Sequence, residues 1–116
     1  MKLKFILLAL SSFVLACNSD SIKTERAEES LTISNSENLE YQLSTGIPIE
    51  GGFSILEQAE HFEVSDIQIN DGGVVYLYTP EAGFTGTDIV KIKREDSNGA
   101  EVYAQTITTI NITVTE

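Results

Sequence analysis

Residues 102–114, Val102-Tyr103-Ala104-Gln105-Thr106-Ile107-Thr108-Thr109-Ile110-Asn111-Ile112-Thr113-Val114, carry the pattern that decides the fold. The even positions hold Val, Ala, Thr, Thr, Ile, Ile and Val, whereas the odd positions are polar apart from Tyr103 and Ile107. This alternation over thirteen residues is typical of a long β-strand with one buried face. Because Ile107 interrupts the alternation, we expect a bend or bulge near it.

The segment before this strand predicts its pairing partner. Val90 and Ile92 alternate with two lysines between Asp88 and Arg94. The connection Glu95–Gly99 contains Asn-Gly, a pair that tolerates positive φ and is common in tight hairpin turns. The two strands are therefore expected to form an antiparallel hairpin.

A second hairpin is predicted around Asn70–Gly73, between strands at 62–69 and 74–79. Pro80 ends the second of these strands because proline has no N–H to donate to the ladder. Within the first strand the apolar residues change from even to odd positions, and a bulge at Ser65-Asp66 would account for the change.

Shorter strands are predicted at 31–34, 39–43 and 53–56, with a helix over 54–61 as the alternative reading of the last one. Six or seven short strands joined by glycine turns predict an all-β domain over residues 31–116. An antiparallel β-sandwich is the first choice, and a small closed barrel is the second.

The N-terminus predicts export from the cytoplasm. Lys2 and Lys4 precede the stretch Phe5–Ala16, which is apolar apart from two serines. Twelve helical residues rise about 18 Å, well short of the roughly 30 Å hydrocarbon core of a bilayer. Residues 1–16 therefore have the form of a cleaved signal peptide rather than a permanent transmembrane helix.

The end of this stretch, Val14-Leu15-Ala16-Cys17, resembles the lipobox of bacterial lipoproteins. The resemblance implies that the chain is cleaved between Ala16 and Cys17 and that a diacylglycerol is attached to the Cys17 thiol. It also implies that the freed amine of Cys17 is acylated, for example with palmitate. Membrane lipid would then be a partner of the chain. The alternative is an ordinary secretory signal with an incidental cysteine. By analogy with enteric bacteria, Asn18 in place of Asp favours the outer membrane. Whether the protein faces the surface or the periplasm stays open.

Residues 17–30 are polar and show no apolar period, so we expect a flexible tether between lipid and domain, with a short amphipathic helix over 21–29 as the alternative. The chain thus divides into a signal peptide (1–16), a tether (17–30) and a β domain (31–116).

Composition excludes several functions. Seven Lys and Arg stand against 18 Asp and Glu, a formal charge of −11, which disfavours binding to nucleic acid. One Cys cannot form an intramolecular disulfide or a thiolate zinc site, and one His leaves few ways to build a catalytic triad.

Residues 60–116 resemble the bacterial Ig-like and cadherin-like repeat domains of surface proteins. The resemblance rests on Tyr78-Thr79-Pro80, on Gly83-Phe84-Thr85-Gly86-Thr87-Asp88, and on the turn and closing strand that follow. It implies an Ig-like sandwich in which Phe84 plugs the base, glycines let the loop pass close to it, and Asp88 caps backbone N–H groups. Aromatic residues common in the strand after Asp88 are absent, as is the calcium-binding linker of cadherins.

No catalytic site is expected. His61 is interpreted as a surface-loop residue, and the pairs Glu28-Glu29 and Glu95-Asp96 as solvated charges. No cofactor is expected either, although calcium would have ligands if the loops brought four acidic residues together at one end of the sandwich: Asp71, Glu81, Asp88 and Asp96. The glycosylation-like triplet at Asn111 is interpreted as incidental.

Tyr103, on the outward parity of the last strand, is the residue we expect to contact a ligand, and an exposed edge strand is a further possible binding surface. Together these features predict a lipid-anchored, non-enzymatic envelope protein whose Ig-like domain binds an unknown protein or glycan. The alternative is an accessory or structural subunit of an envelope complex on the periplasmic side.

Overall fold

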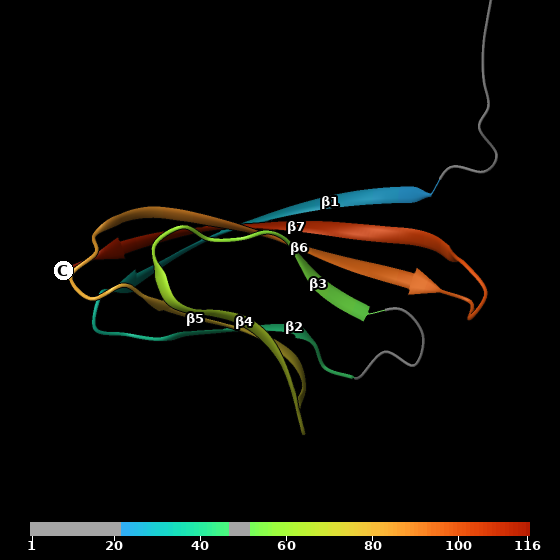
Figure 1. The fold of residues 1–116 in the computed structure, drawn as a ribbon, viewed down its shortest axis with the longest axis horizontal. Helices are drawn as coiled ribbons and strands as arrows, with labels where there is room; N and C mark the ends of the chain where they lie inside the picture. Colours follow the sequence, from blue (N-terminus) through green and yellow to red (C-terminus); the bar gives the residue numbers. More distant parts are fainter. Residues whose placement is uncertain (1–21, 47–51) are drawn as a thin grey trace, which may run out of the picture.

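The computed structural model describes residues 22–46 and 52–116, and this part of the chain is all-β (Figure 1). It forms seven strands in two packed sheets and contains no helix, which confirms the predicted β-sandwich of six or seven strands. The strands are β1 (Lys23–Ser34), β2 (Leu39–Ser44), β3 (Gly52–Glu57), β4 (Phe62–Asn70), β5 (Gly73–Pro80), β6 (Gly86–Ser97) and β7 (Val102–Thr115).

The larger sheet has the order β1-β7-β6-β3 and the smaller sheet the order β2-β5-β4. The predicted hairpin between β6 and β7 is confirmed, with antiparallel pairing from Gly86 opposite Val114 to Ser97 opposite Val102. In its turn, the side chain of Asn98 accepts hydrogen bonds from the N–H groups of Ala100 (2.9 Å) and Glu101 (3.1 Å). Strand β6 begins two residues earlier than expected, at Gly86, and continues three residues past Arg94 because Glu95, Asp96 and Ser97 extend the ladder.

The second predicted hairpin, between β4 and β5, is also present. Gly73 closes it with φ of +125°, and a side chain at this position would overlap the backbone carbonyl of Ser44 in β2. The predicted bulge at Ser65-Asp66 is wrong, since the irregularity lies between Phe62 and Val64. Ser65 points into the molecule instead, where its hydroxyl hydrogen-bonds the Tyr76 hydroxyl at 2.6 Å.

Strand β1 corrects two expectations. It begins at Lys23, so residues 23–30 of the predicted tether are part of the sheet. It also pairs with β7 in parallel, so the sandwich is not antiparallel throughout. Residues 23–30 are exposed throughout, and an edge strand with no buried face leaves no apolar period in the sequence. The ladder to β7, from Lys23 opposite Ala104 to Ser34 opposite Thr115, holds this segment in place.

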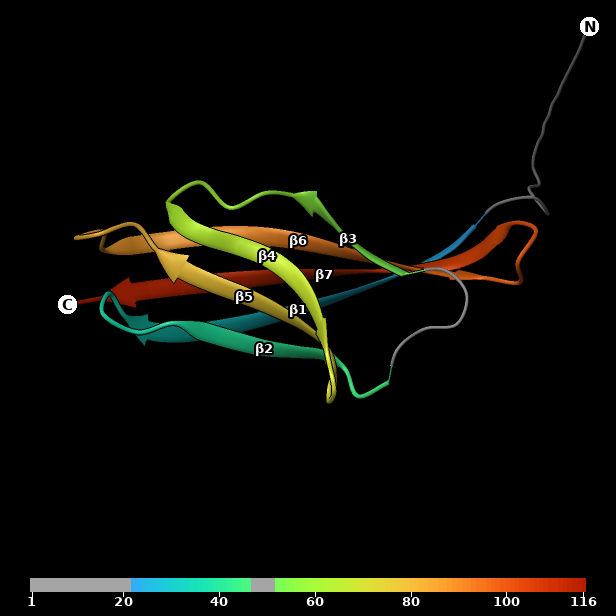
Figure 2. The ribbon, with the colours of Figure 1, turned by 60° about the horizontal axis from the view of Figure 1, so that its bottom comes forward.

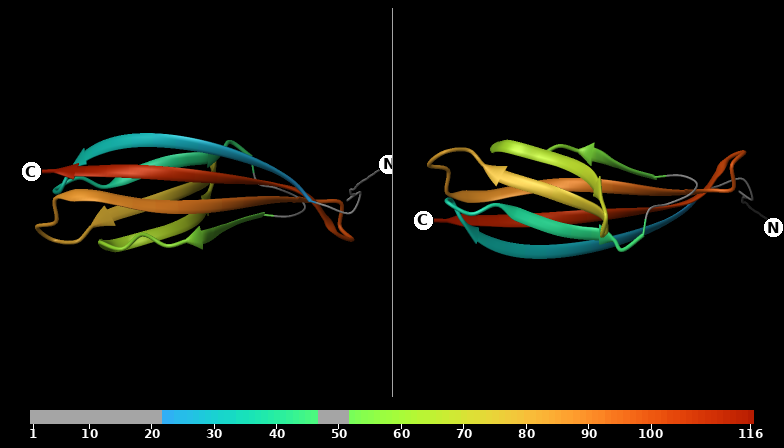
Figure 3. Two further views of the ribbon diagram at one scale, coloured as in Figure 1. Left: turned by 90° about the horizontal axis from the view of Figure 1, so that it is seen from above. Right: turned by 90° about the horizontal axis from the view of Figure 1, so that it is seen from below.

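The core lies between the sheets (Figure 3). Tyr76 and Tyr78 of the smaller sheet pack there among branched aliphatic side chains of the larger sheet: Ile33, Val90, Ile92, Ile110, Ile112 and Val114. The register of β7 is regular around Ile107, so the bend or bulge expected there is absent. Ile107 instead lies on the outer face opposite Lys93 and Arg26, and it is 7% exposed. Long stems of charged side chains can cover apolar surface in this way.

The larger sheet extends beyond the smaller one at the end where β1 begins (Figures 2 and 3). The inner face of β7 changes in composition at this point, from Ile and Val at 110–114 to Thr at 106 and 108. Residues 54–61, for which a helix was the alternative, continue β3 and then turn without forming a helix. Within the described residues, no helix is long and apolar enough to span a membrane.

Candidate functional site

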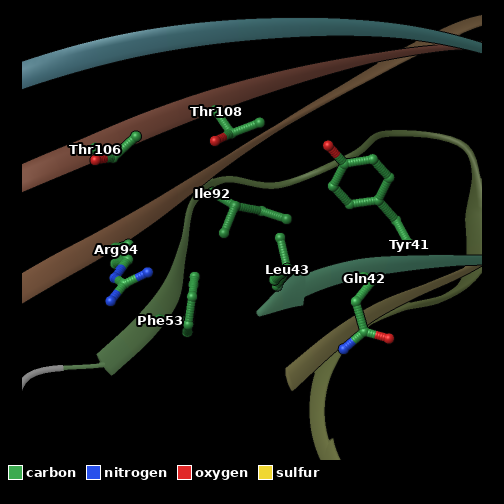
Figure 4. A pocket seen from close by; sticks show the side chains of 8 residues that line it. All are labelled: Tyr41, Gln42, Leu43, Phe53, Ile92, Arg94, Thr106 and Thr108. Carbon is green, nitrogen blue, oxygen red and sulfur yellow. The ribbon is translucent and has the colours of Figure 1, made fainter. Parts of the chain in front are cut away.

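A cleft opens between the two sheets at the overhanging end of the sandwich (Figure 4). Its volume is about 160 Å³, and it is open to solvent. Strands β2, β3, β6 and β7 supply its walls: Tyr41, Gln42, Leu43, Phe53, Ile92, Arg94, Thr106 and Thr108. The cleft exists because the inner face of the larger sheet continues after the smaller sheet has ended.

The walls of the cleft combine apolar and polar groups. Ile92 is fully buried and forms the floor, while Leu43 and Phe53 are half-buried members of the adjoining core. Thr106 and Thr108 face the same space because residues of like parity on β7 share one side of the sheet. Small hydroxyl side chains here leave the gap that the larger Ile110 and Ile112 fill further along the strand.

Arg94 lies at the mouth of the cleft, opposite both Phe53 and Thr106 in the sheet register. Its guanidinium carbon is 5.5 Å from the centre of the Phe53 ring, and its Nε donates a 3.2 Å hydrogen bond to Asp96. The ring and the carboxylate together fix the planar guanidinium.

Tyr41 closes the opposite side. Burial of the phenol raises its pKa above the ordinary value, and the neighbouring Glu29 carboxylate raises it further through its charge and a hydrogen bond. The hydroxyl therefore stays protonated at neutral pH. The residues that line the cleft contain no pair of nucleophile and base.

Asp88 is the most highly coordinated side chain of the fold, and it belongs to the opposite end of the sandwich. It is 3% exposed and accepts hydrogen bonds from the N–H groups of Glu60 (2.8 Å), His61 (2.8 Å) and Ile89 (3.0 Å) and from the Tyr78 hydroxyl (2.9 Å). Burial raises the pKa of this carboxyl, but these hydrogen bonds outweigh burial and hold it below its usual range. The predicted capping role is therefore confirmed.

The four acidic residues considered for calcium do not converge. Asp88 uses its oxygens on protein donors, and Asp96 lies eight residues further along β6, about 26 Å away at strand spacing. Asp71 lies in the β4–β5 turn, apart from Glu81 at the start of the β5–β6 loop. Among the described residues no three His, Cys, Asp or Glu side chains are placed to hold one metal ion.

Phe84 and His61 form a stacked pair at the Asp88 end. Their ring centres are 4.4 Å apart at an interplanar angle of 11°, and Phe84 packs against the core as a partly buried residue. Nδ1 of His61 is 3.6 Å from Glu81 in an exposed contact. A Cβ at Gly86 would lie 3.3 Å from the Phe84 ring, in agreement with the close passage expected of this loop.

The remaining predicted residues lie outside the cleft. Tyr103, at the start of β7, is 57% exposed and is not one of the residues that line the cleft, so its predicted ligand contact stays a prediction. Glu28 accepts a hydrogen bond from Asn111, while Glu95 and Asp96 pair with Lys93 and Arg94. The lipidation and cleavage residues Cys17 and Ala16 lie outside the described residues.

Alternation in the sequence could not reveal the cleft, because its members come from four strands. One signal was available: the inner positions of β7 lose their large aliphatic side chains towards Thr106, which is where the core ends.

Comparisons with known proteins show no family. No family model and no curated protein matches the chain. Among solved structures, the chain is similar to a 2,6-sialyltransferase of Photobacterium sp. JT-ISH-224 in complex with CMP and lactose, at 11% identity and a TM-score of 0.41. The match covers 84% of this chain and 19% of the sialyltransferase, and no statement about function follows from it.

Proposed function

We propose that this protein is a lipid-anchored, non-enzymatic component of the bacterial cell envelope, whose Ig-like sandwich holds a ligand in the cleft between its sheets. The single observation that carries the binding role is the cleft itself. It joins apolar walls, two threonine hydroxyls and the guanidinium of Arg94 within one hollow open to solvent. Binding sites commonly combine apolar walls with a few placed polar groups.

The anchor is argued from the sequence. A basic end, an apolar stretch too short to span a bilayer, and Ala16-Cys17 at its close match a lipoprotein signal. Two or more acyl chains give stable attachment where one does not. Asn18 favours the outer membrane.

A second candidate, a subunit of an envelope complex, is favoured by the length of the tether. Strand β1 starts at Lys23, only six residues after Cys17. At no more than about 3.6 Å per residue, this segment reaches roughly 20 Å. The cleft lies at the same end, so its ligand would have to be close to the membrane. A short reach suits a neighbour in the same membrane better than an external surface.

Photo-crosslinking in cells tests both candidates. A photoreactive residue at Thr106, in the cleft, should give a discrete adduct, whereas the same residue at Gln68 on the outer side of β4 should not. If the partner is membrane-bound, Cys17→Ser should abolish the adduct. The absence of any adduct at Thr106 and Thr108, with the protein present and folded, would contradict the binding role.

A further inference from the structure

We propose that the anchored end of the sandwich, where β1 and the β6–β7 hairpin meet, rests on the anionic headgroup layer of the bilayer, with the long axis of the sheets directed away from it. The proposal rests on the lipid anchor at Cys17, and adds to it an orientation and a contact surface. The anchored end is defined here as residues 22–25 and 93–103.

Chain geometry brings this end to the membrane. Strand β1 enters the larger sheet at the end where the β6–β7 hairpin turns, and it leads away from that end towards the C-terminus (Figures 1 and 2). In the register, Lys23 lies opposite Ala104, and Ala104 lies opposite Asp96. With roughly 20 Å of chain at most between Cys17 and Lys23, the far end of β6 cannot approach the bilayer unless the domain lies down.

The charge distribution opposes lying down. No Lys or Arg occurs from Ala27 to Val90, a segment with twelve Asp and Glu that includes the whole smaller sheet. The five Lys and Arg after the signal peptide lie in β1 and β6, between the middle of the larger sheet and the end nearest the anchor: Lys23, Arg26, Lys91, Lys93 and Arg94. An anionic surface therefore repels the body of the domain more strongly than the anchored end.

Three of the four acidic residues at the anchored end pair with its three cations, and the fourth is Glu101. Glu25 lies 3.7 Å from Lys23, Glu95 lies 3.3 Å from Lys93, and Asp96 pairs with Arg94. All three pairs are at least partly exposed, so their cations can exchange partners with lipid phosphates at little cost. The end is close to neutral, whereas the rest of the domain carries almost all the negative charge.

Two exposed apolar side chains at this end fit the headgroup layer. Tyr103 is 57% exposed and Ile22 is 43% exposed. Tyrosine is enriched at membrane interfaces because its ring is apolar and its hydroxyl is polar. Tyr103, which is expected from its outward position on β7 to contact a ligand, contacts the bilayer in this proposal.

Lipid quenching of a single tryptophan tests the orientation, because the chain contains no Trp. Two variants are compared in the acylated full chain recovered from cells: Tyr103→Trp at the anchored end, and Ala82→Trp in the exposed loop between β5 and β6 at the far end. Each is reconstituted in vesicles of phosphatidylcholine and phosphatidylglycerol that contain brominated phosphatidylcholine. The mass of each protein is measured first to establish acylation at Cys17.

We expect the reporter at position 103 to be quenched at least threefold more than the reporter at position 82. The ratio should fall towards one when Lys93→Gln and Arg94→Gln are added, and when phosphatidylglycerol is omitted. Equal quenching of the two reporters in an acylated protein would overturn the orientation and leave the anchor intact. An unmodified Cys17 would overturn the proposed anchor, and with it this proposal. If the quenching ratio stays the same both in the variant with Lys93→Gln and Arg94→Gln and in vesicles without phosphatidylglycerol, the contact with anionic headgroups would be overturned.

Discussion

Replacement of Asp88 by Asn, a change of one side-chain atom, should destabilise the fold strongly. In Asp88→Asn, the amide oxygen can replace Oδ1 and still accept from Glu60 and Ile89. The amide NH₂ then faces the N–H of His61 and the hydroxyl of Tyr78, which are both donors in the native structure. The Tyr78 hydroxyl can donate to the His61 carbonyl oxygen instead, at 3.0 Å. The backbone N–H of His61 is fixed in direction and would lose its acceptor.

The magnitude follows from these contacts. Hydrogen bonds to a charged group contribute about 1.5–3 kcal/mol each, and a buried donor left unpaired costs about 1–3 kcal/mol. In the variant one buried donor has no acceptor, and the other donors bind a neutral acceptor instead of a charged one. We therefore expect the free energy of unfolding to fall by about 3 kcal/mol at pH 7. The matched control is Asp66→Asn, since Asp66 is exposed and accepts only from the N–H of Ile67. It should change stability by less than about 0.5 kcal/mol.

The pH dependence provides a second test of the same contacts. The pKa of Asp88 is held below its ordinary value in the folded state, so its contribution is complete above the pKa of the unfolded carboxyl and is lost as the pH falls through the folded value. Asn does not titrate. The difference in unfolding free energy between wild type and Asp88→Asn should therefore be constant from pH 7 to 5 and narrow below about pH 4.

Urea unfolding followed by far-UV circular dichroism at these pH values, in a mature chain carrying Cys17→Ser, measures both quantities. A difference below about 1 kcal/mol at pH 7, or an undiminished difference at pH 3, would refute the assignment of these four hydrogen bonds to a carboxylate.

Three further changes test other parts of the fold. Phe84→Ala should cost about 2–3 kcal/mol, less than a fully buried Phe because one face of the ring is covered only by His61, and an unchanged melting temperature would contradict the plug role. Gly73→Ala should cost about 2 kcal/mol or more because of its positive φ and the Ser44 carbonyl, whereas Gly46→Ala, which meets nothing within 4 Å, should be nearly neutral in the same denaturation assay. Millimolar calcium should leave the melting temperature unchanged, since the four candidate carboxylates lie apart; a rise with calcium would show a site that this geometry does not contain.

The two hairpins of this fold could be predicted from the sequence alone. Alternation over 102–114, the Asn-Gly turn and Pro80 each depend on local backbone chemistry, and the structure confirms the strands that they predict. The role of Asp88 came from a family resemblance rather than from periodicity. Its partners Glu60 and His61 lie 28 and 27 residues away, beyond the reach of any local pattern.

The start of β1 shows what alternation cannot detect. Residues 23–30 are exposed on both faces, so their place in the sheet depends on backbone hydrogen bonds to β7, about 80 residues further along the chain. Charged side chains on such an edge resemble a solvated linker. The early start of β1 shortens the predicted tether from fourteen residues to six, so in the proposed lipoprotein the cleft would lie closer to the membrane.

Mass spectrometry of the N-terminal tryptic peptide tests the central claim most directly. Trypsin can cleave after Lys23, which is exposed at the start of β1. Protein extracted from membranes should release the peptide Cys17–Lys23 carrying a diacylglyceryl group on the thiol and an acyl chain on the amine. A peptide that begins elsewhere, or one that begins at Cys17 and carries no lipid, would contradict the account of this protein as a membrane-anchored binding module.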